Sequence, residues 1–325
     1  MLARRINGIA FVALAAALAC AQVLAQGYPA KPLRWLVPYP AGGGSDVIAR
    51  TIGAQLSINV GQPVLIENRP GAGTMIAAEA AAKSAADGYT LLSADNGTLV
   101  FNAALYAKLP YDPVNDLAPV SLIARVPLLL VAHPGFPAGD IKGFVEQARQ
   151  RPGVLNYGSP GAGSPHHLAM ELLKRATGTN LIHVPYKGAA PAVQDLIGGQ
   201  IPLMILDTAV ALPQIRARKI KVLGTLTPSR LATLPAVATT GEQGIADVVA
   251  YAWIGVVVAA ATPRDVIGTL SAEVGRASQN PVVSAKLREF GIEPLASTPE
   301  RMREYVQSES RVWHALIKER DIRLD

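Results

Sequence analysis

Short apolar runs alternate with amphipathic stretches along almost the whole chain. Such runs are typical of buried strands and predict strands at residues 33–37, 64–67, 90–93, 121–124, 128–132, 156–158, 182–184, 203–207, 222–225 and 255–259. Apolar residues at helical spacing predict helices at residues 45–58, 74–82, 141–150, 164–176, 189–197, 210–217, 264–279, 281–290 and 299–320. The alternation favours an α/β fold of mostly parallel sheets flanked by helices, in which ligands bind beyond the carboxyl ends of the strands.

The chain is long enough to form two lobes, since about three hundred residues are too many for one small core. Apolar segments near residues 125–127 and 249–253 indicate two strands that cross between the lobes. The first lobe would then be discontinuous, with residues 26–125 and 250–325, and the second would be residues 126–249. A hinge of two crossing strands lets lobes close on a ligand.

The first residues have the pattern of a signal peptide. A basic head that includes Arg4 and Arg5 precedes the apolar residues 9–19, and Val23 to Ala25 offer suitable cleavage positions. We therefore expect export to the periplasm with cleavage after Ala25. Two other routes stay open: a twin-arginine signal at Arg4 and Arg5, which the following residues match poorly, and lipoprotein anchoring at Cys20.

A glycine-rich turn, Pro38 to Asp46, stands between the first predicted strand and the first predicted helix. This geometry directs free backbone N–H groups of a helix N-terminus at one point, which suits an anion. Glycines lack the Cβ atoms that would keep a ligand away from the backbone. We expect the backbone from Ala41 to Ser45 to bind the ligand, Tyr39 to line the pocket, and Ser45 or Asp46 to cap the helix.

A second turn of the same kind covers Asn156 to Pro165 and precedes another predicted helix. Ser164 is a good N-cap, and Pro165 suits the first helical position. Two such turns facing each other would suit a small ligand with two acidic groups. Neither turn is a nucleotide motif, because no G-x-x-x-x-G-K-[ST] is present and the third glycine of a dinucleotide fingerprint is missing.

Composition excludes several classes of function. Without residues 1–25 the chain would have 28 basic and 24 acidic residues, a mild positive balance that suits an anionic ligand. No basic run or aromatic-interleaved basic helix indicates nucleic-acid binding, and no further apolar stretch is long enough to span a membrane. Cys20 is the single cysteine, so the mature chain would have no disulfide and no thiolate metal site.

A few polar side chains are further candidates for the ligand site. His167 could face the ligand, and Asp207, at the end of an apolar strand, could accept a hydrogen bond from a ligand hydroxyl, an amine or a water. A metal site at His166, His167 and Glu171 is disfavoured, because no third histidine or cysteine lies nearby. We expect no metal and no cofactor.

Six segments together resemble the Bug family, the periplasmic solute receptors of tripartite tricarboxylate transporters of the citrate-receptor type. They are residues 37–50, 67–73, 86–92, 157–164 and 184–188, together with the start of the mature chain at residues 28–32. Each segment is modest alone, but their common order along residues 28–322 is specific. The resemblance implies a type 2 two-lobed periplasmic binding fold that binds a small carboxylate between the lobes.

The resemblance also implies permease subunits as membrane partners, no nucleic acid, and a monomeric receptor without enzymatic activity. Asn96 and Thr98 lie in a loop that varies in the family and are therefore expected to select the ligand. The complete predicted site is Tyr39, Ala41, Gly42, Gly43, Gly44, Ser45, Asn96, Thr98, Gly161, Ala162, Gly163, Ser164, His167 and Asp207.

The identity of the acid stays open among di- and tricarboxylates, aromatic carboxylates, acidic amino acids and nicotinate-like monoacids. Two other functions are also open. The chain could be a ligand-sensing protein for a signalling partner, since the same fold serves sensors. It could also be an exported hydrolase, although no G-x-S-x-G nucleophile motif is present.

Overall fold

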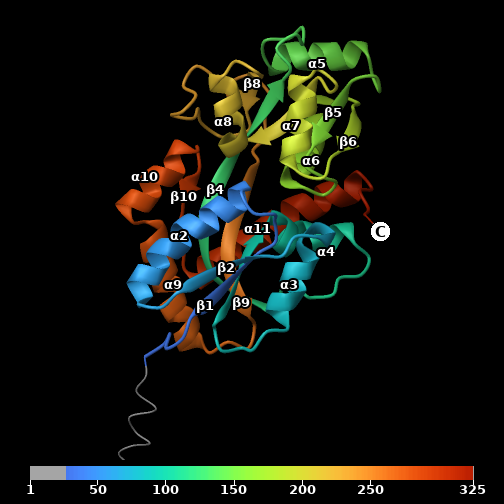
Figure 1. Cartoon of the computed structure of the whole chain (residues 1–325). Coiled ribbons are helices and arrows are strands. Elements are labelled where there is room, and N and C mark those ends of the chain that lie inside the picture. The colour runs from blue at the N-terminus through green and yellow to red at the C-terminus, as the bar shows by residue number, and fades with distance from the viewer. Residues whose placement is uncertain (1–26, 325) are drawn as a thin grey trace, which may run out of the picture.

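The computed structural model describes residues 27–324. It has two lobes of α/β structure connected by long strands (Figure 1). The predicted signal peptide, residues 1–25, lies outside the described residues. The strands and helices predicted from the hydrophobic pattern are present with boundaries that differ by a few residues, apart from the exceptions given below.

The first lobe contains three parallel strands in the order β2-β1-β3: β1 (Leu33–Val37), β2 (Val64–Asn68) and β3 (Thr90–Asp95). Side chains alternate between the faces of β1, because successive residues of a strand point to opposite sides. Leu33, Trp35 and Val37 pack against α2 (Gly44–Val60) and α9 (Arg264–Ser278). Leu36 packs on the other face with α3 (Met75–Ala82). Helices therefore cover both faces, as predicted.

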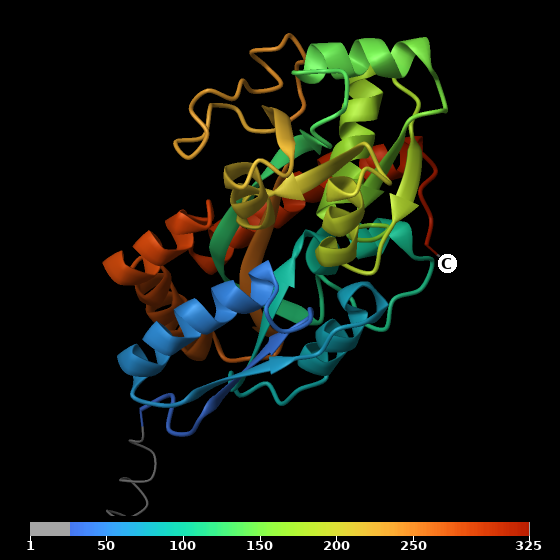
Figure 2. The ribbon, with the colours of Figure 1, turned by 45° about the horizontal axis from the view of Figure 1, so that its top comes forward.

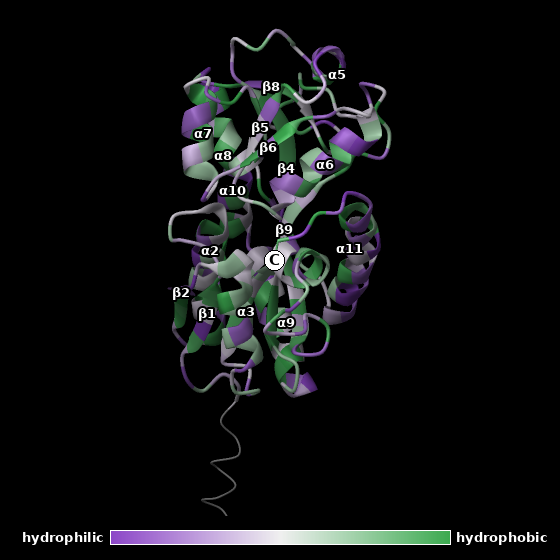
Figure 3. Ribbon diagram, turned by 90° about the vertical axis from the view of Figure 1, so that its right-hand side faces the viewer, coloured by the Kyte–Doolittle hydropathy of each residue, from purple (hydrophilic) through white to green (hydrophobic). Residues whose placement is uncertain are grey.

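The second lobe has the parallel strands β5 (Asn156–Ser159), β6 (Ile182–Pro185) and β7 (Leu203–Asp207) in the order β7-β5-β6. Its helices are α5 (Ile141–Gln150), α6 (Pro165–Thr177), α7 (Ala189–Ile197) and α8 (Thr208–Arg216). Figure 3 shows hydrophobic strand segments inside this lobe and hydrophilic segments on α5 and α6 at its surface. β7 is buried from Leu203 to Leu206, as expected for a parallel strand covered on both faces, whereas the edge strand β6 is partly exposed.

Two long antiparallel strands, β4 (Leu117–Ala132) and β9 (Tyr251–Ala259), join the lobes. The pattern predicted separate strands at residues 121–124 and 128–132, with a crossing between the lobes near residues 125–127, but β4 is a single strand that contains all three segments. Pro127 is the last residue of β4 paired with β9, and from Leu128 onward β4 pairs with β7 and with β8 (Lys221–Thr225). The proline thus lies where the ladder changes partners. Glu293–Pro294 adds the short strand β10 beside β4.

The C-terminal region links both lobes. After α10 (Pro281–Glu289), the long helix α11 (Pro299–Glu319) runs along the molecule (Figure 2). The end of the chain lies next to α4 (Asn102–Leu105), and the Leu324 amide donates a hydrogen bond to the Leu105 carbonyl at 3.0 Å. Arg175 of α6 forms an ion pair of 3.3 Å with Glu319 of α11. The residue boundaries predicted for the two lobes stay a prediction.

Candidate functional site

The carboxyl ends of β3 and β7 point toward each other. β3 and β4 are both antiparallel to β9, so they run in the same direction, whereas β7 runs against β4. Asp95, which ends β3, pairs with Ile254, and Ile254 pairs with Ala124 of β4; Asp207, which ends β7, pairs with Leu128 of β4. At about 3.3 Å per residue, the two strand ends are offset by about 13 Å along β4.

The two glycine-rich turns follow β1 and β5, which are parallel to β3 and β7 respectively. Both turns therefore lie at the facing strand ends. Ligands of open α/β sheets bind at such carboxyl ends. The topology thus places the two predicted anion sites on opposite sides of one region.

The first turn leads into α2 with Gly43 as the N-cap, so the prediction of Ser45 or Asp46 as the cap is wrong. The first helical hydrogen bond runs from the Val47 amide to the Gly43 carbonyl at 3.0 Å. Asp46 lies inside the first helical turn, and its carboxylate reaches back to accept the Gly42 amide at 2.9 Å. The residue predicted to cap the helix end therefore stabilises the turn from within the helix.

The backbone amides of Gly43, Gly44 and Ser45 donate no hydrogen bond within residues 27–324. The first amides of a helix have no intrahelical acceptor and are partly positive because of the helix dipole. The negative charge of Asp46 beside them is compensated by Arg50, whose Nε lies 2.9 Å from its carboxylate. Burial raises the pKa of Asp46, but the hydrogen bonds from Arg50, Gly42 and Asn68 lower it further, so the net shift is downward. The start of α2 can therefore receive an anion.

Tyr39, predicted to line the pocket, donates its hydroxyl hydrogen bond to the Asp95 carboxylate at the end of β3. Burial and the negative charge of Asp95 raise the pKa of Tyr39 well above its usual value, so the phenol stays protonated. The same carboxylate accepts the amide of Thr98 at 2.9 Å and lies 2.8 Å from the Thr98 hydroxyl. Asp95 thus fixes Tyr39 and Thr98; sequence reasoning missed it, although its place at a strand end was a signal.

Asn96 and Thr98 begin a π-helical turn, Gly97–Phe101, that the pattern did not predict. Asn96 is fully buried, and its side chain bonds to the β9 backbone: Nδ2 donates to the Tyr251 carbonyl at 3.2 Å and Oδ1 accepts the Trp253 amide at 2.9 Å. Asn96 therefore links β3 to a strand that joins the lobes. A ligand contact of Asn96 or Thr98 stays a prediction.

The second turn begins α6 as predicted, with Ser164 as the N-cap and Pro165 in the first helical turn. Most amides of this turn are used within it. The amide of Gly161 donates to the Ser159 hydroxyl at 3.2 Å, that of Gly163 to His167 Nδ1 at 3.1 Å, and that of His167 to the Ser164 hydroxyl at 3.2 Å. The turn thus offers fewer free amides than the first.

His167 is buried and forms part of an aromatic stack. Its ring lies parallel to that of His183, with centroids 3.9 Å apart, and the His183 ring stacks on Tyr157 at 4.9 Å. Burial, with the positive charge of Lys174, lowers the pKa of His167 to about 4. Burial and the neighbouring His167 lower the pKa of His183 to about 3. Both rings are therefore neutral at pH 7. His167 stabilises the turn by accepting the Gly163 amide, and a ligand contact of His167 stays a prediction.

Asp207 accepts two hydrogen bonds at the end of β7. Its Oδ1 caps α8 by accepting the Val210 amide at 3.0 Å, and its Oδ2 lies 3.2 Å from His166 Nε2. Burial raises the pKa of Asp207, but the bond to His166 and the cap outweigh burial and lower it. His166 is the second residue of α6, and no feature of the local pattern distinguishes it from His167.

The two lobes touch beside the second turn. Gly163 has φ +74°, and a Cβ atom there would lie 2.8 Å from Leu105 of α4 and 2.7 Å from Leu324. On the other side of the molecule, the Thr208 hydroxyl at the start of α8 donates to the Gly291 carbonyl at 2.8 Å. Only a residue without a side chain allows this approach at Gly163.

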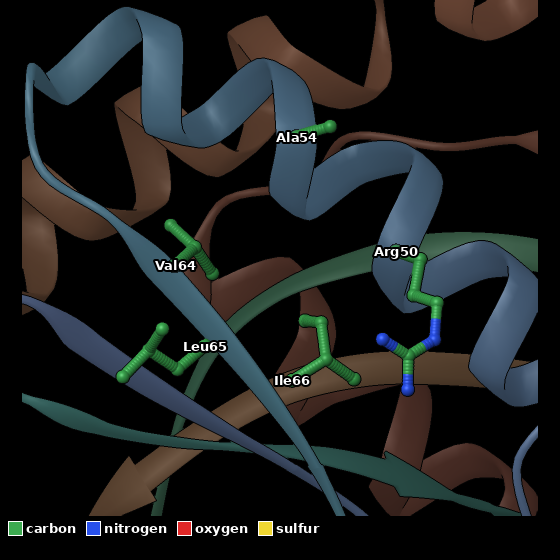
Figure 4. A pocket seen from close by; sticks show the side chains of 5 residues that line it. All are labelled: Arg50, Ala54, Val64, Leu65 and Ile66. Carbon is green, nitrogen blue, oxygen red and sulfur yellow. The ribbon is translucent and has the colours of Figure 1, made fainter.

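A separate depression of about 450 Å³ is lined by Arg50, Ala54 and residues Val64 to Ile66 (Figure 4). It lies between the middle of α2 and the edge strand β2, away from the facing strand ends. Its one charged residue, Arg50, is already bound to Asp46 and to Asn68. The depression is therefore a poor candidate for an anion site.

Within residues 27–324 no group of three or more histidine, cysteine, aspartate or glutamate residues could hold a metal ion. In the same residues, no helix combines the length and the apolar character that a membrane span requires.

Comparison with known proteins gives consistent matches. The model of the family described as "Tripartite tricarboxylate transporter family receptor" matches residues 48–322. Protein BugT of Bordetella pertussis is 35% identical over 321 residues, which cover 98% of this chain and 98% of BugT.

Solved structures with bound acids are also similar. R. palustris Rpa4515 with adipate is 35% identical, with a TM-score of 0.84 over 90% of this chain and 97% of that one. MatC (Rpa3494) from Rhodopseudomonas palustris with bound malate is 32% identical, with a TM-score of 0.81 over 89% of this chain and 100% of that one.

Proposed function

The chain belongs to the receptor family of tripartite tricarboxylate transporters, and from this premise we propose that it binds a small carboxylate between the facing strand ends of its two lobes. Membership confirms the family predicted from the sequence. The acid would be a di- or tricarboxylate, an aromatic carboxylate or a related acid. The receptor would deliver it to the permease subunits of a transporter in the membrane.

One observation carries the proposal: the start of α2 offers unpartnered amides at the strand ends that face the other lobe. Each charge-assisted hydrogen bond to a carboxylate contributes about 1.5–3 kcal/mol. Two or three such bonds, less the costs of ordering and desolvation, are compatible with micromolar affinity, near −8 kcal/mol. The relatives solved with adipate and malate support an organic acid as the ligand.

The other parts of the proposal follow from the family. A transporter receptor acts outside the cytoplasmic membrane, so we expect a periplasmic location. It binds its ligand without changing it, so we expect no catalytic turnover. A monomer suffices, because both glycine-rich turns come from one chain.

A thermal-shift screen of the mature protein with organic acids tests the proposal. A ligand at a hundred times its Kd adds about 2.7 kcal/mol to the free energy of unfolding, which raises the melting temperature measurably. Each acid that stabilises the protein is then followed by calorimetry and by chromatography of the recovered acid. Saturable binding of an unchanged acid supports the proposal. No stabilisation by any carboxylate, or conversion of the acid, would contradict it.

A further inference from the structure

His166 holds a buried polar atom without a partner at the facing strand ends. The residue is 9% exposed, and its Nδ1 accepts or donates no hydrogen bond within residues 27–324. In the described part of the chain three other buried side-chain atoms share this property, and they belong to Asn156 at the start of β5, to Glu273 in α9 and to Arg320 after α11. Buried polar groups are normally hydrogen-bonded, and each exception requires an explanation.

The position of His166 gives that explanation. The residue lies in the first turn of α6, which starts at the carboxyl end of β5, and its ring contacts Asp207 at the carboxyl end of β7. Both strand ends face the first lobe. The ring therefore lies at the edge of the second lobe where the ligand of the proposed function would bind.

Asp207 fixes which ring nitrogen carries the proton. A carboxylate can only accept, so the hydrogen of the Asp207–His166 bond lies on Nε2. In the neutral ring, Nδ1 then presents a lone pair and needs a donor. Asp207 is itself held in place, since its other oxygen caps α8 through the Val210 amide.

We propose that His166 Nδ1 accepts a hydrogen bond from a hydroxyl or amino group of the ligand, so that the receptor selects hydroxy- or amino-substituted carboxylates. This inference rests on the proposed function. The carboxylate lies at the start of α2 in the first lobe, and the substituent meets His166 in the second lobe. An acid without such a group leaves Nδ1 buried and unpaired, which costs affinity.

Matched ligand pairs test the selectivity by calorimetry on the mature chain: malate against succinate, aspartate against succinate, and 3-hydroxyglutarate against glutarate. Loss of one buried hydrogen bond corresponds to about a tenfold change in affinity, so we expect the substituted acid to bind at least about tenfold more tightly in one pair. His166→Phe keeps a ring but removes the acceptor, and should bring the two affinities of that pair together. His133→Phe is the matched control and should keep the preference, because His133 follows the end of β4 that pairs with the start of β7, whereas Asp207 lies at the opposite end of β7.

Asp207→Asn provides a second, nearly isosteric variant. Its amide oxygen must still accept the Val210 amide, which leaves the NH₂ group to donate to His166 Nε2. The ring proton then moves to Nδ1, which becomes a donor, and the preference for the substituted acid should disappear. Nitrogen-15 NMR of the histidine rings reads this change of tautomer directly, with the proton on Nε2 in the wild type and on Nδ1 in the variant.

The outcomes separate the two proposals. If carboxylates bind but no matched pair differs, or if His166→Phe keeps the preference, the role of His166 is contradicted while the receptor function stands. If no carboxylate binds the wild type, the receptor function fails and this inference fails with it. A proton on His166 Nδ1 in the wild type would also overturn the inference.

Discussion

Replacing Gly43 by valine should weaken ligand binding with little effect on folding. Gly43 has φ −79° and ψ 169°, a conformation open to any residue, and an added Cβ would meet only the Pro40 carbonyl oxygen, at 3.5 Å. Valine is a poorer N-cap than glycine by about 0.5–1 kcal/mol. Valine also lowers the conformational entropy of the unfolded chain relative to glycine, which stabilises the folded state by about 0.4–1 kcal/mol. The free energy of unfolding should therefore change by less than about 1 kcal/mol.

The effect on binding is larger. The branched side chain would occupy the space in which a carboxylate approaches the amides of Gly43 and Gly44. Each charge-assisted bond that is lost removes about 1.5–3 kcal/mol, which raises Kd about tenfold to a hundredfold. Gly268→Val, on the exposed face of α9 with no atom within 4 Å of the added Cβ, is the matched control.

Calorimetry with the best acid from the screen measures Kd for both variants, and urea unfolding measures their stability. We expect a raised Kd in Gly43→Val alone, with both proteins folded. An unchanged Kd in Gly43→Val would remove the start of α2 from the ligand site and refute the reasoning.

Three further changes have definite expected results. Tyr39→Phe removes the phenolic donor of the buried Asp95 carboxylate, which keeps only its bonds from Thr98. The free energy of unfolding should fall by about 1–3 kcal/mol in urea titrations, and an unchanged midpoint would show that the bond contributes nothing. Gly163→Ala places a Cβ atom at a backbone position with positive φ and against two leucine side chains, so the melting temperature of this variant should fall. An unchanged melting temperature would mean that the lobes do not touch there. Acid should destabilise the protein, because the pKa values of His167 and His183 are lowered from 6.5 to about 4 and about 3 in the folded state. As the pH falls, these histidines bind protons in the unfolded chain before they do so in the folded one. The free energy of unfolding is therefore highest above pH 6.5 and decreases toward pH 4, for His167 by up to about 1.4 kcal/mol per pH unit. Equal urea midpoints at pH 7 and pH 5 would contradict this.

Local pattern sufficed for most of the fold. Buried parallel strands are apolar on both faces and therefore read as short continuous runs, as in Leu33–Val37. The local pattern failed where strand pairing or side-chain contacts decide where an element begins or ends. Pro127 interrupts the apolar run, yet β4 passes through it, because the strand changes partners at that residue. The helical turn after β3 is stabilised by two hydrogen bonds from Thr98 to the Asp95 carboxylate. Such side-chain bonds leave no trace in the hydrophobic periodicity.

The candidate site could be predicted only in part. Strand–glycine–helix spacing correctly placed both turns, but it could not tell which amides stay free. That depends on side chains that fold back, as Asp46 does onto Gly42 and His167 onto Gly163. His166 and His167 are adjacent and alike in sequence. The bond from His166 to Asp207 joins residues 41 positions apart, so the fold alone distinguishes the two rings.

A crystal structure of the protein with the acid that binds most tightly tests the central claim most directly. We predict one carboxylate of the ligand within hydrogen-bond distance of the amides of Gly43 to Ser45, and the other end of the ligand against His166 in the second lobe. A ligand bound anywhere other than between the facing ends of β3 and β7, or held by one lobe alone, would contradict it.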